Sequence, residues 1–88
     1  MISPLHEIFY HPDVLKKDLP KLSTTSKQHI SKAIEMKLML SPEEFGEPLR
    51  RTLKGYWKLR VGDYRVIYKV SNRQVIIFRI GHRREVYD

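Results

Sequence analysis

The sequence predicts an α+β fold in the order β-α-α-β-β-β, with a small, largely antiparallel sheet and two helices packed on one of its faces. Residues 54–70 contain two runs of alternating apolar and polar side chains around a Gly-Asp pair, which is typical of a β-hairpin, and residues 74–80 resemble a further strand. Residues 30–38 carry apolar side chains at helical spacing. The 88 residues form a single domain, 1–88.

The hairpin is the element around which the rest of the chain is arranged. A two-residue loop at Gly62 and Asp63 suits a type II′ turn, which has Gly at its first central position. Antiparallel partners keep a constant sum of residue numbers, so this loop places Arg60 opposite Arg65. Because side chains alternate between faces, one face is apolar and the other is cationic. The apolar face contains Trp57, Leu59, Val61, Tyr64, Val66 and Tyr68, and the cationic face contains Tyr56, Lys58, Arg60, Arg65, Ile67 and Lys69.

The positive charge is concentrated in the same half of the chain. Residues 1–49 contain six lysines against seven acids, a balance of −1, whereas residues 50–88 contain eleven Lys or Arg against three acids, a balance of +8. Like charges directly opposite each other, as Arg60 and Arg65 are, cost up to about 1 kcal/mol. A sheet that tolerates this repulsion favours an anionic partner, and nucleic acid is the kind that such a basic half attracts. The alternative is that these side chains are simply solvated.

The N-terminal half supplies the first strand and the first helix. Residues 5–10 are rich in strand formers, and Pro12 with Asp13 is typical of the first turn of a helix. Three leucines at helical spacing should share one face of this helix, and a proline should end it. These four residues are Leu15, Leu19, Leu22 and Pro20.

A second, longer helix follows. Thr25 with Gln28 fits a capping box at its start. Its buried stripe is predicted to contain Ile30, Ala33, Ile34 and Leu38. Residues 41–44 end this helix and cap one further turn, and residues 45–48 form a loop.

The last strand is predicted to pair with the second strand of the hairpin through a three-residue loop at 71–73. This loop places Arg79 with the cationic face and puts Ile76, Phe78 and Ile80 on the apolar face. A two-residue loop would reverse the faces and put Arg79 in the core. The three-residue loop is therefore the prediction.

Composition excludes several classes of protein. The chain has no cysteine, so it has neither disulfides nor thiolate zinc ligands. No signal peptide is apparent, and no apolar run approaches the roughly 18 residues of a membrane span. We therefore expect a cytoplasmic protein without a membrane partner. The four histidines lack metal-ligand spacing and the four glycines form no phosphate-binding loop, so no metal or cofactor is expected.

Cleavage of RNA needs no metal, because the 2′-hydroxyl is an internal nucleophile. One group must remove its proton, another must protonate the leaving oxygen, and cations must stabilise the charged phosphorane. Groups of these kinds are present in the basic half: Lys58, Arg60, Arg65, Arg79, His82, Arg83 and Tyr87.

The runs PLRRTLKGYWKLRVGDYRVIYKV at 48–70 and IIFRIGHRREVY at 76–87 resemble the RelE/ParE superfamily of toxin-antitoxin toxins, and the RelE branch in particular. The resemblance spans nearly the whole chain. It implies the toxin of a type II toxin-antitoxin system, an endoribonuclease that cleaves mRNA in the ribosomal A site by 2′-hydroxyl attack. It also implies two kinds of partner, a cognate antitoxin protein and the ribosome with its mRNA.

The resemblance also implies roles for individual residues. Lys58 matches a catalytic lysine, and Arg65, Arg83 and Tyr87 match two arginines and a near-terminal tyrosine of the family. Where the best-studied members carry a second lysine, this chain has Tyr56, so His82 is a candidate replacement. Either Lys58 or His82 is expected to carry protons. The residues expected to contact RNA are Lys54, Tyr56, Arg60, Lys69, Arg79 and Arg84.

Two alternatives remain open. A ParE-like toxin of the same fold poisons DNA gyrase without cutting RNA, and an inactive relative would only bind nucleic acid or an antitoxin. Some of the site residues also have simpler interpretations, since Tyr87 could pack against the sheet, His82 could be a surface residue, and Arg84 could be solvated or face the antitoxin.

Overall fold

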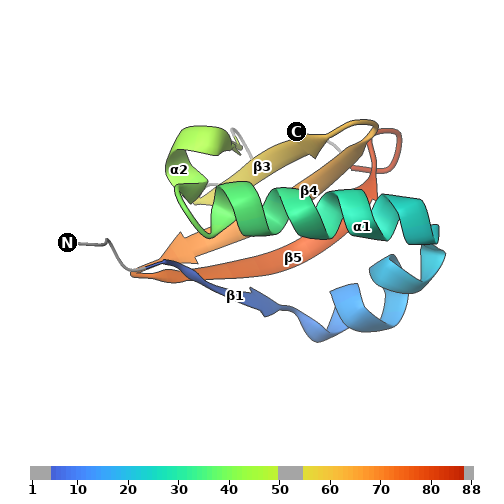
Figure 1. Ribbon diagram of the computed structural model, residues 1–88, viewed down its shortest axis with the longest axis horizontal. Coiled ribbons are helices and arrows are strands. Elements are labelled where there is room, and N and C mark those ends of the chain that lie inside the picture. Colours follow the sequence, from blue (N-terminus) through green and yellow to red (C-terminus); the bar gives the residue numbers. More distant parts are fainter. Residues whose placement is uncertain (1–4, 50–54, 87–88) are drawn as a thin grey trace.

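The computed structural model describes residues 5–49 and 55–86 and contains a five-stranded sheet in the order β1-β5-β4-β3-β2 (Figure 1). The strands are β1 (Glu7–Tyr10), β2 (Glu47–Pro48), β3 (Tyr56–Val61), β4 (Tyr64–Ser71) and β5 (Gln74–His82). All neighbouring pairs are antiparallel except β1 and β5, which run parallel. The α+β class and the largely antiparallel sheet are confirmed.

The central hairpin has the predicted register. Arg60 pairs with Arg65 and Trp57 pairs with Tyr68 across β3 and β4. Gly62 has a φ of +58°, a backbone conformation that would be strained in a residue with a side chain. The two-residue turn and this register confirm the predicted division of the hairpin side chains between two faces.

The connection between β4 and β5 differs from the prediction. Ser71 pairs with Gln74, so the loop has two residues rather than three. Asn72, at the first loop position, adopts a φ of +57°, which asparagine tolerates better than most residues. The two-residue loop places Val75 and Ile77 in the core, where Ile76 and Phe78 were expected.

A β-bulge then restores the predicted faces further along β5. Tyr68 pairs with Ile77 and Ile67 pairs with Arg79, so Phe78 has no partner residue in the ladder. Beyond the bulge, Ile80 lies in the core and Arg79 lies on the opposite face, as expected. The prediction was therefore wrong for Ile76 and Phe78 and right for Ile80 and Arg79.

The two edges of the sheet were predicted less well. The first strand begins at Glu7, and β1 runs beside β5 with the Glu7 amide donating to the Arg73 carbonyl at 2.7 Å. The parallel pairing has no local sequence signal, because its two strands come from opposite ends of the chain. At the other edge, β2 forms within the segment predicted to be a loop.

The first helical segment is irregular. It consists of a π-helical turn η1 (Val14–Asp18) and a 3-10 turn η2 (Leu19–Lys21), and it ends one residue after Pro20. The face prediction was wrong at one position, because Val14 is buried and Leu15 is exposed. Leu15 therefore lies on the solvent side of the π-helical turn.

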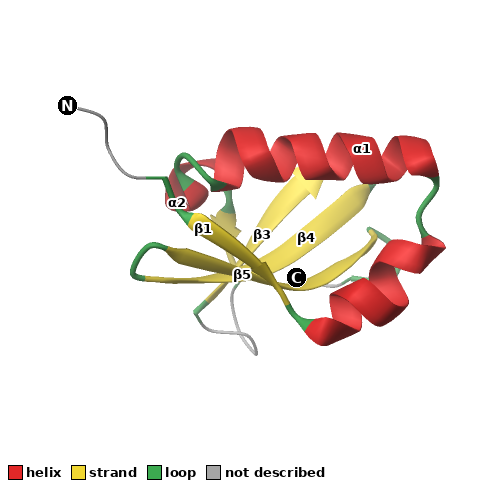
Figure 2. Cartoon of the chain, turned by 60° about the horizontal axis from the view of Figure 1, so that its bottom comes forward, coloured by secondary structure: helices red, strands yellow, loops and turns green. Residues whose placement is uncertain are grey.

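Helix α1 (Thr24–Ala33) continues into a π-helical turn η3 (Ile34–Leu38) and lies across one face of the sheet (Figure 2). Its N-cap is Ser23, whose hydroxyl accepts from the Ser26 amide at 3.1 Å, so the predicted cap at Thr25 was placed two residues late. The predicted stripe is confirmed, with Ile30, Ile34 and Leu38 buried. A short helix α2 (Pro42–Phe45) follows.

The opposite face of the sheet is not simply a cationic surface. Ile67 is buried there, and it forms a second apolar cluster with Leu49 and Val86, against which Tyr56 packs. Both Leu49 and Val86 come from outside the hairpin, so alternation within the hairpin did not predict this cover. Among the described residues, no helix has the length and apolar character needed to cross a membrane.

Candidate nucleic-acid interface

Lys58 lies in the middle of β3, between Glu47 on β2 and Ile67 on β4. It is 4% exposed, and it is the one charged side chain buried within the part of the chain that the structure describes. Its strand position places it on the sheet face opposite α1, together with Ile67. A lysine is rarely buried to this degree, so Lys58 is the first residue on this face to consider for a chemical role.

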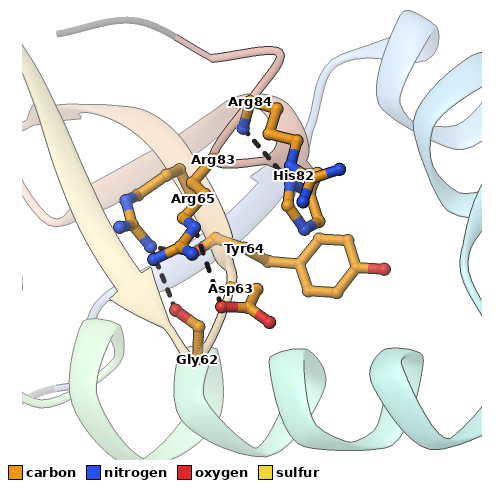
Figure 3. Close-up of polar contacts among 7 residues, drawn as sticks. All are labelled: Gly62, Asp63, Tyr64, Arg65, His82, Arg83 and Arg84. Atoms are coloured by element: carbon orange, nitrogen blue, oxygen red, sulfur yellow. Dashed lines mark hydrogen bonds and ion pairs between the residues drawn. The ribbon is translucent and has the colours of Figure 1, made fainter.

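Two arginines are fixed at the tip of the central hairpin, as Figure 3 shows. The guanidinium of Arg65 donates through Nη1 to the carbonyls of Gly62 and Tyr64, at 3.1 and 2.9 Å. The Arg83 amide donates to the Asp63 carbonyl at 2.7 Å, and Arg83 Nε lies 3.9 Å from Asp63 Oδ1. The turn therefore positions both guanidinium groups at one end of the sheet.

His82 lies on the other face. It pairs with Tyr64, whose ring packs against the helix-covered core, and the two rings meet edge to face with centroids 5.7 Å apart. In Figure 3 the His82 and Tyr64 rings project together, away from the Arg65 guanidinium. The Arg84 amide donates to His82 Nδ1 at 3.2 Å, which leaves Nε2 as the protonated nitrogen of the neutral ring. The structure thus separates His82 from Lys58 by the thickness of the sheet.

A cavity of about 350 Å³ opens beside His82, between the first helical segment and the end of β5. Asp18 lines it and also accepts from the Ile80 amide at 2.9 Å, a contact that spans 62 positions of the chain. The remaining lining residues are Lys21, Leu22, Tyr64, Arg79, Ile80, Gly81, His82, Arg84 and Glu85. Arg79 and Arg84, both expected to contact RNA, therefore border this cavity.

The other cations expected to bind RNA are distributed over the face opposite α1. Arg60 Nε lies 3.5 Å from Glu47 Oε1, and both side chains are exposed. Lys69 Nζ lies 5.5 Å from the centre of the Tyr56 ring. Arg79 is exposed and lies opposite Ile67. Lys54 and Tyr87, also predicted as site residues, fall outside the described residues.

The structure thus brings Lys58, Arg60, Arg65, Lys69 and Arg79 onto one face. Phe78, which was predicted to lie in the core, also lies on this face. No local signal marked its bulge, because neither Gly nor Pro stands at the irregular position. In the part of the chain that the structure describes, no cluster of three or more His, Cys, Asp or Glu residues is arranged to hold a metal ion.

The fold is that of a class of small α+β toxins known from solved structures. The chain is similar to a chain of the toxin-antitoxin complex RelBE2 from Mycobacterium tuberculosis, with a TM-score of 0.83 and 27% identity over 93% of this chain and 94% of that one. It also resembles a chain of the archaeal RelE-RelB complex from Pyrococcus horikoshii OT3, with a TM-score of 0.69 and 24% identity over 92% of this chain and 98% of that one.

The family model of the ParE toxin of type II toxin-antitoxin systems (parDE) matches residues 8–87, so the chain belongs to this family within the RelE/ParE superfamily. Two curated relatives, Toxin RelG and Toxin RelE of Mycobacterium tuberculosis, are each 38% identical over 52 residues, or 57% of this chain. The matched regions span 60% and 54% of those two relatives.

Proposed function

We propose that the protein is the toxin of a type II toxin-antitoxin system and acts in the cytoplasm as a ribosome-dependent endoribonuclease that cuts mRNA in the A site. The observation that carries the proposal is the buried Lys58 on a sheet face that also bears Arg60, Arg65, Lys69 and Arg79. A cationic face of this kind attracts a phosphate backbone, and a lysine on that face is a group of the kind that transfers protons in catalysis.

The reaction follows from these groups. The 2′-oxygen loses its proton and forms a bond to phosphorus, and the bond from phosphorus to the 5′-oxygen breaks as that oxygen receives a proton. The products are a 2′,3′-cyclic phosphate and a 5′-hydroxyl, and no metal is needed. Lys58 carries a proton in this scheme, because His82 lies on the opposite face of the sheet from Arg65.

The arginines have an electrostatic role. Arg65 and Arg83, both fixed to the hairpin turn, stabilise the negative charge that develops on the phosphate oxygens. The hydrogen bonds of the Arg65 guanidinium and the ion pair of Arg83 with Asp63 place both groups beside the turn before RNA binds, so less reorganisation is needed during the reaction. Tyr87 completes the proposed site by its resemblance to the family tyrosine.

A cognate antitoxin is the proposed protein partner. Its support is that the similar solved structures from Mycobacterium tuberculosis and Pyrococcus horikoshii are of toxin-antitoxin complexes. An antitoxin that covers the basic sheet face would block access of mRNA to Lys58 and the turn arginines. Purification of the toxin expressed with its neighbouring open reading frame, followed by measurement of the mass of the complex, tests this assignment.

Poisoning of DNA gyrase is a second candidate, and the ParE description of the matching family favours it. Two reactions in parallel separate the candidates: translation of a reporter mRNA in a cell extract, and supercoiling of a relaxed plasmid by gyrase. The nuclease proposal predicts that translation stops with mRNA fragments while supercoiling continues. Arrest of supercoiling with intact mRNA would replace it with the gyrase function.

A further inference from the structure

The bulge in β5 gives two consecutive residues to the same face of the sheet. In a regular strand Phe78 and Arg79 would point to opposite faces. Here Phe78 is the residue without a ladder partner, its ring contacts Tyr56, and Arg79 lies opposite Ile67. A phenylalanine and an arginine that are consecutive in the sequence therefore both lie on the face that contains Lys58. Bulges commonly redirect side chains in this way beside functional sites.

Phe78 is the centre of a group of aromatic side chains, which we call the β5 aromatic patch and define as Phe9, His11, Tyr56 and Phe78. The Phe78 ring meets Tyr56 edge to face at a centroid distance of 5.2 Å and lies 5.6 Å from the His11 ring. Phe9 belongs to the same face because it pairs with Ile76, and it is 44% exposed. Phe9, Tyr56 and Phe78 come from three strands, His11 directly follows β1, and the patch is partly open to solvent.

Core packing does not account for Phe78, although Tyr56 packs against the second apolar cluster. Phe78 belongs to neither of the two buried clusters, and it is half-buried. Lys69 is exposed and approaches the Tyr56 ring at 5.5 Å, while Arg79 is exposed beside Phe78. Aromatic faces flanked by cations are the surfaces on which proteins stack the bases of single-stranded nucleic acid.

We propose that Phe78 stacks on a base of single-stranded RNA and that Arg79 binds the adjoining phosphate. The charge of this half of the chain selects a polyanion over an apolar protein segment. Tyr56, whose ring contacts Phe78, stands two residues before Lys58 on the same face, or about 7 Å along the strand. The stacked base therefore belongs to a nucleotide next to the one held at Lys58, and in this respect the inference rests on the proposed function.

The test measures binding separately from cleavage. The purified full chain is titrated with a short single-stranded RNA that carries 2′-O-methyl groups and cannot be cut by 2′-hydroxyl attack, and binding is followed by fluorescence anisotropy. A series of such oligonucleotides, each with one abasic position, locates the stacked base. Phe78→Leu keeps an apolar side chain but removes the ring, and Phe45→Leu is the matched control at a 49% exposed phenylalanine on α2.

We expect Phe78→Leu to weaken binding about tenfold, as the loss of one stacked base should, and Phe45→Leu to leave it unchanged. At one position in the series, the abasic substitution should weaken binding by the wild-type protein and have little further effect on Phe78→Leu. Thermal unfolding of both variants shows whether the fold is retained. Arg79→Gln should weaken binding and reduce its dependence on salt.

Three outcomes would overturn the inference. In the first, the wild-type protein shows no detectable binding of the oligonucleotide. In the second, the losses of binding caused by Phe78→Leu and by each abasic position are independent of one another. In the third, Phe78→Leu leaves RNA binding unchanged but abolishes antitoxin binding. The last would make the patch a protein-docking surface. If the protein cuts A-site mRNA but Phe78→Leu and the abasic positions act independently, the stacking proposal alone is wrong. If they act on the same contact but the protein cuts no mRNA, the nuclease proposal alone is wrong.

Discussion

Asp63 holds Arg83 at the tip of the central hairpin through its backbone carbonyl, which accepts from the Arg83 amide at 2.7 Å, and through its carboxylate, 3.9 Å from Arg83 Nε. The backbone bond ties the segment after β5 to the turn before β4. Because one of the two contacts uses only the backbone, a change of the Arg83 side chain should leave the path of the chain intact.

Arg83→Ala should therefore impair cleavage without unfolding the protein. Loss of one group that stabilises the charged phosphate lowers the rate by about 10² to 10³-fold. Single-turnover cleavage of A-site mRNA measures the effect, and thermal unfolding checks the fold. Arg73→Ala is the matched control, since it removes the same charge from an exposed position in the β4–β5 loop. Equal losses in the two variants would show that net charge, rather than the position of Arg83, matters.

The proton carrier is tested by comparing Lys58 with His82, which lie on opposite faces of the sheet. Lys58→Met keeps the aliphatic chain and should lower the cleavage rate by about 10²-fold or more, as expected when a proton-transfer group is removed. His82→Gln should cause a much smaller loss. A large loss in His82→Gln with full activity in Lys58→Met would assign the proton transfer to the imidazole and refute our scheme.

Tyr68 and Gly46 are in close contact, so substitutions at the two positions should have coupled effects on the free energy of unfolding. The Tyr68 hydroxyl donates to the Pro42 carbonyl at 2.6 Å, and a Cβ atom added at Gly46 would collide with that hydroxyl. Gly46→Ala should lower the free energy of unfolding by about 1 to 3 kcal/mol, because the backbone there suits alanine but the space does not. Tyr68→Phe should cost about 1 kcal/mol.

The cost of Gly46→Ala should be smaller when Tyr68 has already been replaced by Phe, because the colliding oxygen is then absent. Urea denaturation of the wild type, both single variants and the double variant measures this coupling. Strict additivity of the two effects would show that the contact is relieved by movement elsewhere.

Alkaline pH provides a separate test of the same side chain. Burial raises the pKa of Tyr68 above its usual value, and the charge of Glu43 raises it further. Above about pH 10 the phenol ionises in the unfolded chain and stays protonated in the folded one, so the free energy of unfolding falls as the pH rises. Above about pH 10, the Tyr68 phenol steepens this fall in the free energy of unfolding by at most about 1.4 kcal/mol per pH unit. Below about pH 9 it contributes nothing to the fall. Tyr68→Phe should remove that share. An identical decline between pH 10 and 11 in both proteins would contradict it.

The elements that sequence alone predicted are those with strong local signals. The register of the hairpin followed from a two-residue turn at Gly62, and the stripe through Ile30 and Ile34 followed from helical spacing. The parallel β1–β5 pair and the two-residue β2 strand were missed, because each depends on contacts with distant parts of the chain.

The site was predicted in composition more than in arrangement. The chain pattern placed Lys58 and Arg65 on one face, and the register confirms this. It gave no sign that Leu49 and Val86 bury that face around Ile67, nor that His82 lies with Tyr64 on the other side. The bulge at Phe78 was missed because a longer loop before β5 also satisfied the alternation of apolar residues. Only the burial of both Ile77 and Ile80 in the folded protein selects the shorter loop with a bulge.

The proposed activity is tested most directly with a ribosome stalled on end-labelled mRNA, with an empty A site, and with the same mRNA free in solution. One matched mRNA carries a 2′-deoxy nucleotide at the cleavage position. We expect the wild-type protein to cut only the ribosome-bound mRNA, within the A-site codon, and to leave a 2′,3′-cyclic phosphate. The 2′-deoxy mRNA and the Lys58→Met protein should both prevent the cut. An uncut message, or equal cutting of the 2′-deoxy mRNA, would contradict the proposed mechanism.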